Sequence, residues 1–336
     1  MYLTSTTIHF FSLLYIIFII IIILYCKKYF IPNYPKDFFI PNYPTYNELY
    51  VSELSKLKPN KLRYLAILPN ADSFVSKNNL WNILRDTKFS YIVPETYLLD
   101  NFNDLARFKL NYQDNKLYIL KKNIQNKKGI KLIKDTPEKI IGEYYNNDYK
   151  VLQEYIYNTV LGKVFVIRVY ILAIKRKEEK VEVYYNKYNK LLFAKEKINN
   201  LAINNLSLIT DSSCRNNPRN LRGLLDLLES SDLLELSNNL ANSEILSSNL
   251  NKVLLGIKYI IEKQSNNVLP NLVKYQLFGV DIICNNNLEC YLLEINKNPN
   301  MLNYHCKEEF QEKNIIKNDI INLVNNAKLN QSFQEI

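Results

Sequence analysis

Glycine is scarce in this chain, and that scarcity restricts how the fold could hold a nucleotide. The 336 residues contain only six glycines. No two of them have the spacing of GxGxxG or of GxxxxGK[ST], the patterns of the dinucleotide-binding turn and of the P-loop. The sequence therefore argues against a Rossmann turn and a P-loop. If the chain binds a nucleotide, it must do so without a glycine cradle.

The numbers of histidines and cysteines argue against further classes of functional site. Hydrophobic residues at 47% and charged residues at 23% are typical of a folded protein, and the length suits one large domain or two fused ones. With only His9 and His305, a His/Cys zinc site or a Ser/His/Asp set is not expected. The five cysteines include no CxxC pair. We interpret them as reduced, intracellular cysteines rather than a disulfide framework.

The N-terminus has the character of a membrane span. Residues 1–26 carry no charged side chain, and the nineteen mostly apolar residues 8–26 would extend about 28 Å as a helix, enough to cross a hydrocarbon core. The basic start and small-residue site of a cleaved signal peptide are absent from this segment. Lys27 and Lys28 follow it directly. We therefore predict a transmembrane anchor at 1–28, with the rest of this single-pass protein in the cytosol.

A proline-containing repeat follows the predicted anchor. The sequence FIPNYP occurs at 30–35 and again at 39–44, and prolines at this density favour an extended, semi-rigid chain. We interpret 29–59 as a spacer that holds the following domain away from the bilayer. A duplicated codon block without a role is the alternative.

Beyond residue 60 the hydrophobic pattern predicts a mixed α/β (α+β) fold with antiparallel sheets and helices. Strands are expected at 62–68, 90–93, 116–121, 130–133, 149–156 and 163–173, with hairpins at 181–185/190–194 and 275–284/288–296. Helices are expected at 77–86 and 136–145, as two or three segments within 216–264, and after 317, where a frayed end follows.

The second hairpin carries the most informative residues. If Asn286–Asn287 form a two-residue turn, Asp281 faces Leu292 and Gly279 faces Glu294. The alternation of a strand then places Asp281 and Glu294 on one face of the sheet. The core face is expected to hold Val280, Ile282, Leu293 and Ile295.

Asn296 joins these two carboxylates on the predicted polar face. Two carboxylates and an amide are costly to bury without partners, and a hard cation such as Mg²⁺ removes that cost. A solvent-exposed polar face is the alternative explanation.

The hairpin sequence FGVD…LLEINKNP at 278–299 resembles the closing motif of the tubulin–tyrosine ligase-like family, within the ATP-grasp superfamily. Further segments resemble that family in the same order, at 92–99, 118–121 with 129–130, 151–156, 165–168 and 208–211. The resemblance implies an ATP-grasp domain at 60–310, followed by a C-terminal helix and tail at 311–336.

The resemblance also implies roles for the matching positions, with ATP and Mg²⁺ as cofactors. Phosphates would contact Lys77 and Lys121, and the adenine edge would be formed by Gln153, Tyr155 and Ile156. Arg168, Thr210 and Glu294 would act on the reacting groups. Mg²⁺ would be held by Asp281, Glu294 and Asn296, of which Asp281 and Asn296 also serve ATP binding.

Several positions depart from the family pattern. Apolar residues replace a Lys, an Asp, an Arg and a His at Val164, Val166, Leu192 and Leu208; Asp211 replaces an Asn, and Glu154 stands where the tyrosine ligase has Lys. Lys190 lies two residues from Leu192 on the same strand face. Each lost polar contact is worth about 1–3 kcal/mol where a buried partner is left unsatisfied. ATP binding is therefore better supported than catalysis.

These expectations lead to a carboxylate–amine ligase that adds a free amino acid to an acidic protein, such as a tubulin tail. The net charge of +10 suits an acidic partner and equally suits a nearby anionic membrane. The alternatives are a non-catalytic relative that binds ATP or an acidic partner at a membrane, and an ATP-grasp ligase with a small-molecule substrate. Nucleic acid is not expected as a partner, because the lysines are scattered.

Overall fold

The computed structural model describes residues 38–39, 64–123, 129–157, 164–176, 179–194, 210–211, 243–265, 273–297, 299–301, 307–326 and 332–336. Among these residues, no helix combines the length and apolar character that crossing a membrane requires. The anchor predicted at 8–26 and residues 216–242 lie outside the described ranges, so both remain predictions.

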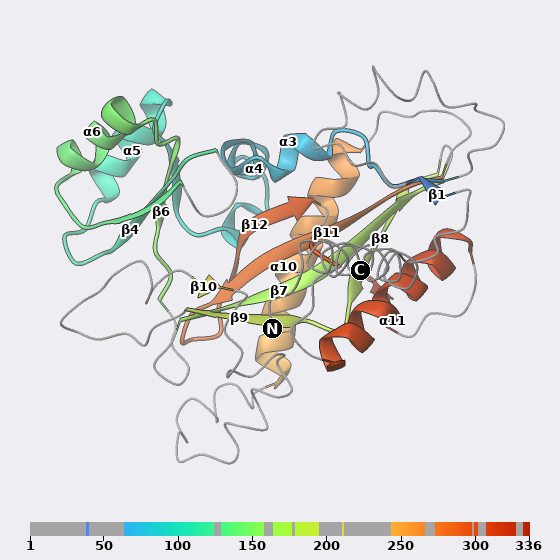
Figure 1. Cartoon of the computed structure of the whole chain (residues 1–336). Coiled ribbons are helices and arrows are strands. Elements are labelled where there is room, and N and C mark those ends of the chain that lie inside the picture. The colour runs from blue at the N-terminus through green and yellow to red at the C-terminus, as the bar shows by residue number, and fades with distance from the viewer. Residues whose placement is uncertain are drawn as a thin grey trace, which may run out of the picture.

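A large sheet forms the centre of the described molecule (Figure 1). Nine strands take part, in the order β1-β2-β11-β7-β8-β13, with β12 beside β11 and with β9 and β10 continuing from β7. The strands are β1 (Phe38–Phe39), β2 (Tyr64–Leu65), β7 (Phe165–Lys175), β8 (Val181–Asn186), β9 (Lys190–Ala194), β10 (Thr210–Asp211), β11 (Val273–Cys284), β12 (Cys290–Lys297) and β13 (Phe333–Glu335). Among the strands that the structure describes, only β1–β2 and β2–β11 pair in parallel.

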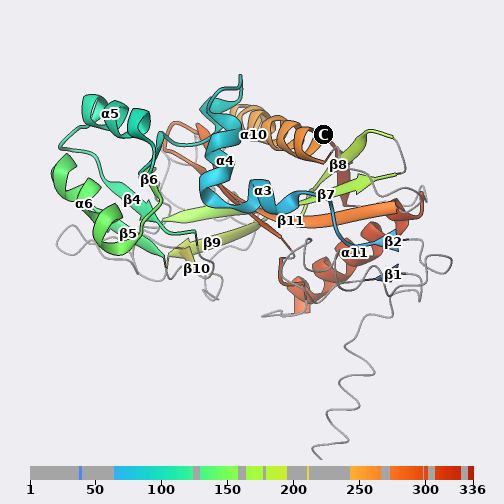
Figure 2. The same ribbon diagram turned by 90° about the horizontal axis from the view of Figure 1, so that it is seen from above.

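Helices cover both faces of this sheet (Figure 2). One face packs on α3 (Ala71–Val75), α4 (Lys77–Leu84) and α10 (Ser243–Gln264), and the other packs on α11 (Lys307–Val324). Along β7, Ile167 and Val169 join the core on the α10 side, whereas Tyr170 and Leu172 join the core on the α11 side. Burial on both faces explains why β7 reads as an almost continuous apolar run.

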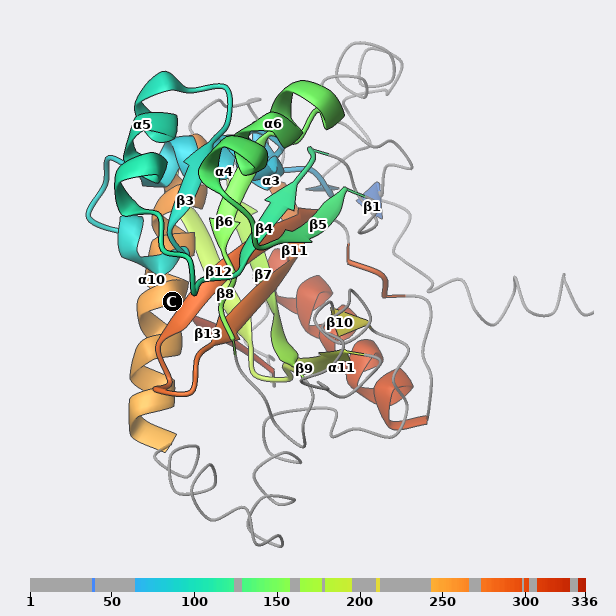
Figure 3. The same cartoon turned by 90° about the vertical axis from the view of Figure 1, so that its left-hand side faces the viewer.

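A smaller sheet with two helices lies beside the large one (Figure 3). Its order is β3-β6-β4-β5, formed by β3 (Thr96–Leu98), β4 (Tyr118–Lys121), β5 (Ile130–Ile133) and β6 (Val151–Glu154), with α5 (Phe102–Asn111) and α6 (Pro137–Asn147). Phe108 of α5 and Ile140 of α6 pack with Tyr118 in one buried cluster. The strand predicted at 90–93 is wrong: Ser90–Ile92 is a 3-10 helix, and the strand begins after Pro94.

The hairpin of β11 and β12 has a longer loop than predicted. Residues 285–289 connect the strands, with Leu288 in the left-handed conformation and the Asn285 side chain accepting from the amides of Asn287 and Glu289. The longer loop shifts the pairing by one residue, so that Ile282 faces Leu292, and a bulge adds a second residue, so that Asp281 faces Glu294. At Asp281 the predicted register is therefore wrong by two residues. Because side chains alternate with a period of two, this error leaves Asp281 and Glu294 on one face.

A β-bulge interrupts the same hairpin. Asp281 pairs with Glu294 but Ile282 pairs with Leu292, so Leu293 is an extra residue on β12. The prediction that Leu293 faces the core is therefore wrong, because Leu292 takes that place and Leu293 packs on the opposite face. The core positions predicted for Val280, Ile282 and Ile295 are confirmed.

The C-terminal residues are more ordered than expected. The predicted helix after 317 is confirmed but begins earlier, as α11 at Lys307. The frayed end is wrong, because β13 pairs with β8. The Ser332 amide and hydroxyl both donate to buried Asp319 of α11, and this bond holds the chain end against the sheet.

Two cysteines also depart from the prediction. Cys284 and Cys290 form a disulfide across the ends of β11 and β12, so the interpretation of all five as reduced is wrong for this pair. The mixed α/β architecture of antiparallel sheets and helices is as predicted.

Candidate functional site

The centre of the site is an ion pair between neighbouring strands. Arg168 of β7 stands opposite Asp281 of β11. Its Nε donates to Oδ1 and its Nη2 to Oδ2 of Asp281, both at 2.7 Å, a bidentate geometry that fixes both side chains. Burial disfavours the Arg168 charge, but the Asp281 carboxylate outweighs it and raises the Arg168 pKa.

Glu294 and Asn296 of β12 complete the polar face predicted from the sequence. Glu294 lies directly across from Asp281, and Asn296 Nδ2 donates to Glu294 Oε1 at 2.8 Å. Burial raises the Asp281 pKa to about 6; Arg168 opposes this shift and Glu294 adds to it. For Glu294, burial is outweighed by the Asn296 hydrogen bond and by Lys77 and Lys121, so its pKa is lowered.

These three side chains fit a hard divalent cation. Mg²⁺ prefers one or two carboxylates, with phosphate and water oxygens completing the octahedron. No group of three or more His, Cys, Asp or Glu side chains suited to a metal occurs in the described part of the chain. A cation here would therefore use the two carboxylates, with Asn296 offering Oδ1 because its Nδ2 already donates to Glu294.

Gly279 allows the chain after β12 to approach β11. A Cβ atom at Gly279 would lie 3.0 Å from Pro299 Cβ and 3.7 Å from Arg168 Cδ. The first distance is tighter than ordinary packing, so only glycine accommodates Pro299 at its present position. The glycine of the FGVD sequence thus has a steric explanation.

Lys121 and Gln153 are residues of the small sheet that lie at the site. Lys121 Nζ donates to Gln153 Oε1 at 2.6 Å, and Gln153 Nε2 donates to Thr96 Oγ1 at 2.8 Å. Burial lowers the Lys121 pKa to about 8; Glu294 and Asp281 oppose this shift, and Lys77 reinforces it. The buried ammonium therefore lies within electrostatic reach of both carboxylates.

A cavity of about 20 Å³ lies between the two sheets and α4, close to the size of one water molecule. Its walls include Lys77 at the start of α4, Lys121 and Gln153 of the small sheet, and Leu292 and Leu293 of β12. The two lysines predicted to contact phosphate thus share one cavity, which adjoins the hairpin that carries Glu294.

Tyr155 and Ile156, predicted at the adenine edge, follow β6. The Tyr155 amide donates to the Leu117 carbonyl at 2.9 Å, so this atom already has a backbone partner. Ile156 packs against Val166 and Leu192 in an apolar cluster. Thr210 lies on β10, opposite Ala194 of β9, so β9 separates it from Arg168 of β7.

Two of the family departures are partners of each other. Val166 of β7 and Leu192 of β9 stand opposite in register, and each is 5% exposed. Together with Ile283 and Leu293 they form a buried apolar cluster on the sheet face that also carries Arg168. The resemblance implies an Asp and an Arg at these two positions; here both side chains are apolar and stand opposite each other.

Sequence reasoning missed the ion pairs that surround the site. Lys190 stands opposite Arg168, and its Nζ lies 2.6 Å from Glu309 Oε1, which Lys313 Nζ also contacts at 3.1 Å. Glu154 lies 2.9 Å from Lys116. The first pair joins residues 119 positions apart, so no local spacing could have indicated it.

Comparison with known proteins agrees with this geometry. The family model described as tubulin-tyrosine ligase family matches residues 43–332, a range that contains every site residue named above. A search of the curated proteins finds no match. Because the match spans well over half of the 336 residues, the chain belongs to the tubulin-tyrosine ligase family.

Proposed function

We propose that this protein is an ATP- and Mg²⁺-dependent ligase that joins an amino acid to an acidic protein. Family membership suggests ATP-dependent ligase-type activity in general. The observation that carries the finer proposal is the assembly of Arg168, Asp281, Glu294 and Asn296 on one sheet face, with Lys121 held nearby in electrostatic contact.

The donor set suits nucleotide phosphates and their metal. Asp281, Glu294 and Asn296 would hold Mg²⁺, and Lys77 and Lys121 would contact the phosphates from the α4 and small-sheet side. When bound, Mg–ATP would supply the phosphoryl group that activates a substrate carboxylate as an acyl phosphate, from which an amine displaces phosphate to form an amide bond. The protein's part is to position the reactants and neutralise their charge.

The neighbouring apolar cluster has the character that suits a nucleobase. Ile156, Val166 and Leu192 pack in one cluster with Ile283 and Leu293, and aromatic ring systems gain most of their binding energy by leaving water for such surfaces. We expect the adenine ring to pack here, with Gln153 and the backbone of Tyr155 and Ile156 at its edge.

Arg168 has two tasks in this proposal. It orients Asp281 through two hydrogen bonds, and its retained positive charge stabilises negative charge that develops on the reacting groups. Thr210, on β10 beside β9, would act from the far side of that strand.

The substrate class rests on charge and on the N-terminus. A net charge of +10 would speed encounter with an acidic polypeptide, and a tubulin tail is the family's namesake. The anchor predicted at 8–26 would hold the domain on the cytosolic side of a membrane. Protease protection of sealed vesicles tests this topology, and a lumenal domain would contradict it.

An incorporation assay tests the proposed function. The full chain in detergent is incubated with Mg–ATP, an acidic peptide and glutamate, glycine or tyrosine. We expect the release of ADP and phosphate and a peptide mass increased by one or more amino-acid residues. The same assay with tubulin identifies the modified protein, and Glu294→Gln is the inactive control.

One observation favours a second candidate, a non-catalytic relative that binds ATP or an acidic partner. Val166 and Leu192, which stand opposite each other next to the metal face, are apolar where the resemblance implies charged side chains. Mg-dependent ATP binding without incorporation of any amino acid would support this candidate and refute ligation.

A further inference from the structure

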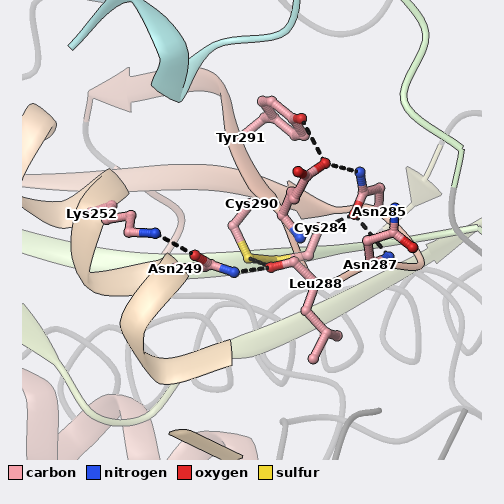
Figure 4. Close-up of a disulfide and its surroundings, with 9 residues drawn as sticks. Asn249, Lys252, Cys284, Asn285, Asn287, Leu288, Cys290 and Tyr291 are labelled. Atoms are coloured by element: carbon pink, nitrogen blue, oxygen red, sulfur yellow. Dashed lines mark hydrogen bonds between the residues drawn. A yellow bond between two sulfur atoms is a disulfide. The ribbon is translucent and has the colours of Figure 1, made fainter. Parts of the chain in front are cut away.

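The disulfide closes the end of the hairpin that carries the candidate metal ligands (Figure 4). Cys284 is the last residue of β11 and Cys290 the first of β12, and they stand directly opposite. Both are buried, at 4% and 8% exposure, and they belong to the core cluster beneath α10.

Other contacts hold the same end of the hairpin only by hydrogen bonds. The Asn285 amide donates to the Glu289 carbonyl at 2.9 Å, and Asn249 Nδ2 of α10 donates to the Leu288 carbonyl at 2.8 Å (Figure 4). Asn287 and Glu289 are exposed, so water competes for the polar groups of the loop. Within the described hairpin, the disulfide is the one covalent cross-link between side chains of the two strands, in addition to the backbone of the loop at 285–289.

The disulfide lies close to the site along the strand ladder. Two residue pairs, Ile283–Tyr291 and Ile282–Leu292, separate it from the Asp281–Glu294 pair, and the bulge at Leu293 falls within this short stretch. A bulge is a place where two registers differ by one residue. A shift of one residue in β12 would carry Glu294 to the opposite face.

We propose that Cys284–Cys290 is a redox-modification site that sets the register of this hairpin. The disulfide holds Cys284 opposite Cys290 and so keeps Glu294 opposite Asp281. Reduction to two thiols, which cannot approach as closely as bonded sulfurs, loosens this stretch and weakens Mg–ATP binding. Disulfides in the cytosol, where we propose that this domain lies, are typically transient and redox-sensing. The nucleotide part of this inference rests on the proposed function.

The oxidant class that fits is a small peroxide. One cysteine thiolate attacks a peroxide oxygen and breaks the O–O bond, which gives a sulfenic acid and, after proton uptake, water. The second thiol displaces the sulfenic oxygen as water and forms the S–S bond. The two thiols lose two electrons and hydrogen peroxide gains them. A dithiol reverses the step and becomes a cyclic disulfide. Burial slows access by bulky disulfides, so small reagents are required.

The experiment compares the full chain after hydrogen peroxide treatment and after dithiothreitol treatment. Mass spectrometry of alkylated peptides reports whether Cys284 and Cys290 are bonded. Hydrogen exchange then measures protection of the amides of 281–294, and titration calorimetry measures the Mg–ATP Kd. In the reduced protein we expect faster exchange in 281–294 and a Kd roughly tenfold higher.

Matched variants separate this site from the other cysteines. The double variant Cys284→Ser/Cys290→Ser should behave as the reduced protein under both treatments, whereas Cys214→Ser/Cys306→Ser should keep the full redox response. Should the first variant fail to fold, the wild-type comparison alone decides.

Three results would overturn the inference. They are free thiols at 284 and 290 after peroxide treatment, equal exchange of 281–294 in both redox states, or equal Mg–ATP affinity in both states. If neither state binds Mg–ATP, the proposed function fails on its own, and the exchange of 281–294 still decides whether the disulfide controls the hairpin.

Discussion

Two neighbouring pairs on one face of the large sheet differ in the polarity of their buried side chains. Along β7, Arg168 faces Asp281 in a bidentate ion pair, whereas Val166, two residues earlier, faces Leu192 in an apolar pair. Relatives are expected to carry charges at both places. This difference indicates that buried charges are kept or lost in pairs, because removing one partner leaves the other charge buried and uncompensated.

The comparison also indicates whether the loss of charge at Val166 and Leu192 affects folding or function. Replacing both members of a buried polar pair by apolar groups of similar shape is nearly neutral for stability. Val166 and Leu192 are both buried and packed, so the fold has no remaining partner to satisfy. Any cost of these substitutions therefore falls on substrate binding or turnover rather than on folding.

The largest effect is expected when one charge is removed from the Arg168–Asp281 pair. Arg168→Met leaves the buried Asp281 carboxylate without its bidentate partner, so we expect the free energy of unfolding to fall by about 3–5 kcal/mol. Denaturant unfolding monitored by circular dichroism measures it. Arg168→Met/Asp281→Asn should recover part of the loss.

Lys139→Met is the matched control, because Lys139 pairs at 3.1 Å with Asp135 on the surface and such surface pairs contribute less than about 1 kcal/mol. Equal losses for Arg168→Met and Lys139→Met would show that the Asp281 pair has no special role.

The next test removes charge from the candidate metal ligands. Glu294→Gln keeps the shape and the contact with Asn296 but removes one carboxylate from a site that needs hard anionic oxygens. We expect Mg-dependent ATP affinity to fall by about 100-fold, near 2.7 kcal/mol, as measured by calorimetry with and without Mg²⁺. Glu289→Gln, in the exposed loop of the same hairpin, should bind normally. Unchanged binding by Glu294→Gln would refute the metal assignment.

A third test rebuilds the lost pair. Val166→Asp places a carboxylate in the apolar cluster and should lower the free energy of unfolding by about 2 kcal/mol. Adding Leu192→Arg supplies the partner across the register and should return at least about 0.5–1 kcal/mol of coupling. Ligase activity gained only in the double variant would identify this pair as the cause of a silent site. Additive losses would show that the two positions no longer interact.

The polar face could be predicted from sequence because a register error of two residues does not change which side chains share a face. The predicted register was wrong by two residues, yet Asp281, Glu294 and Asn296 still share a face, since alternation repeats every two residues. The prediction for Leu293 was wrong because the bulge inserts one residue into β12. A shift by an odd number of residues moves a side chain to the opposite face of the sheet. Local spacing carries no signal for such a bulge.

Contacts between distant segments were beyond sequence reasoning. Lys190 meets Glu309 across 119 positions, and Ser332 joins β13 to α11 through Asp319. The cysteine pair was missed for another reason. Its partners are six residues apart, and only the five-residue loop at 285–289 brings them opposite each other. The short strand at β3 was displaced because Pro94 was taken as a strand end rather than as the boundary before one.

The smallest expected effect concerns the glycine that lies beside Arg168. Gly279→Ala would place a Cβ 3.0 Å from Pro299 Cβ, so the chain after β12 must shift by a few tenths of an ångström, and we expect a loss of about 1 kcal/mol. Gly142 offers the same substitution without a clash. It lies within α6 with nothing within 4 Å of its Cβ position, so Gly142→Ala should instead stabilise the protein by about 0.5–1 kcal/mol. Opposite signs in denaturant unfolding would tie Gly279 to the close approach of Pro299. If both variants gain stability, the approach is not tight in solution, and the steric account of this glycine fails.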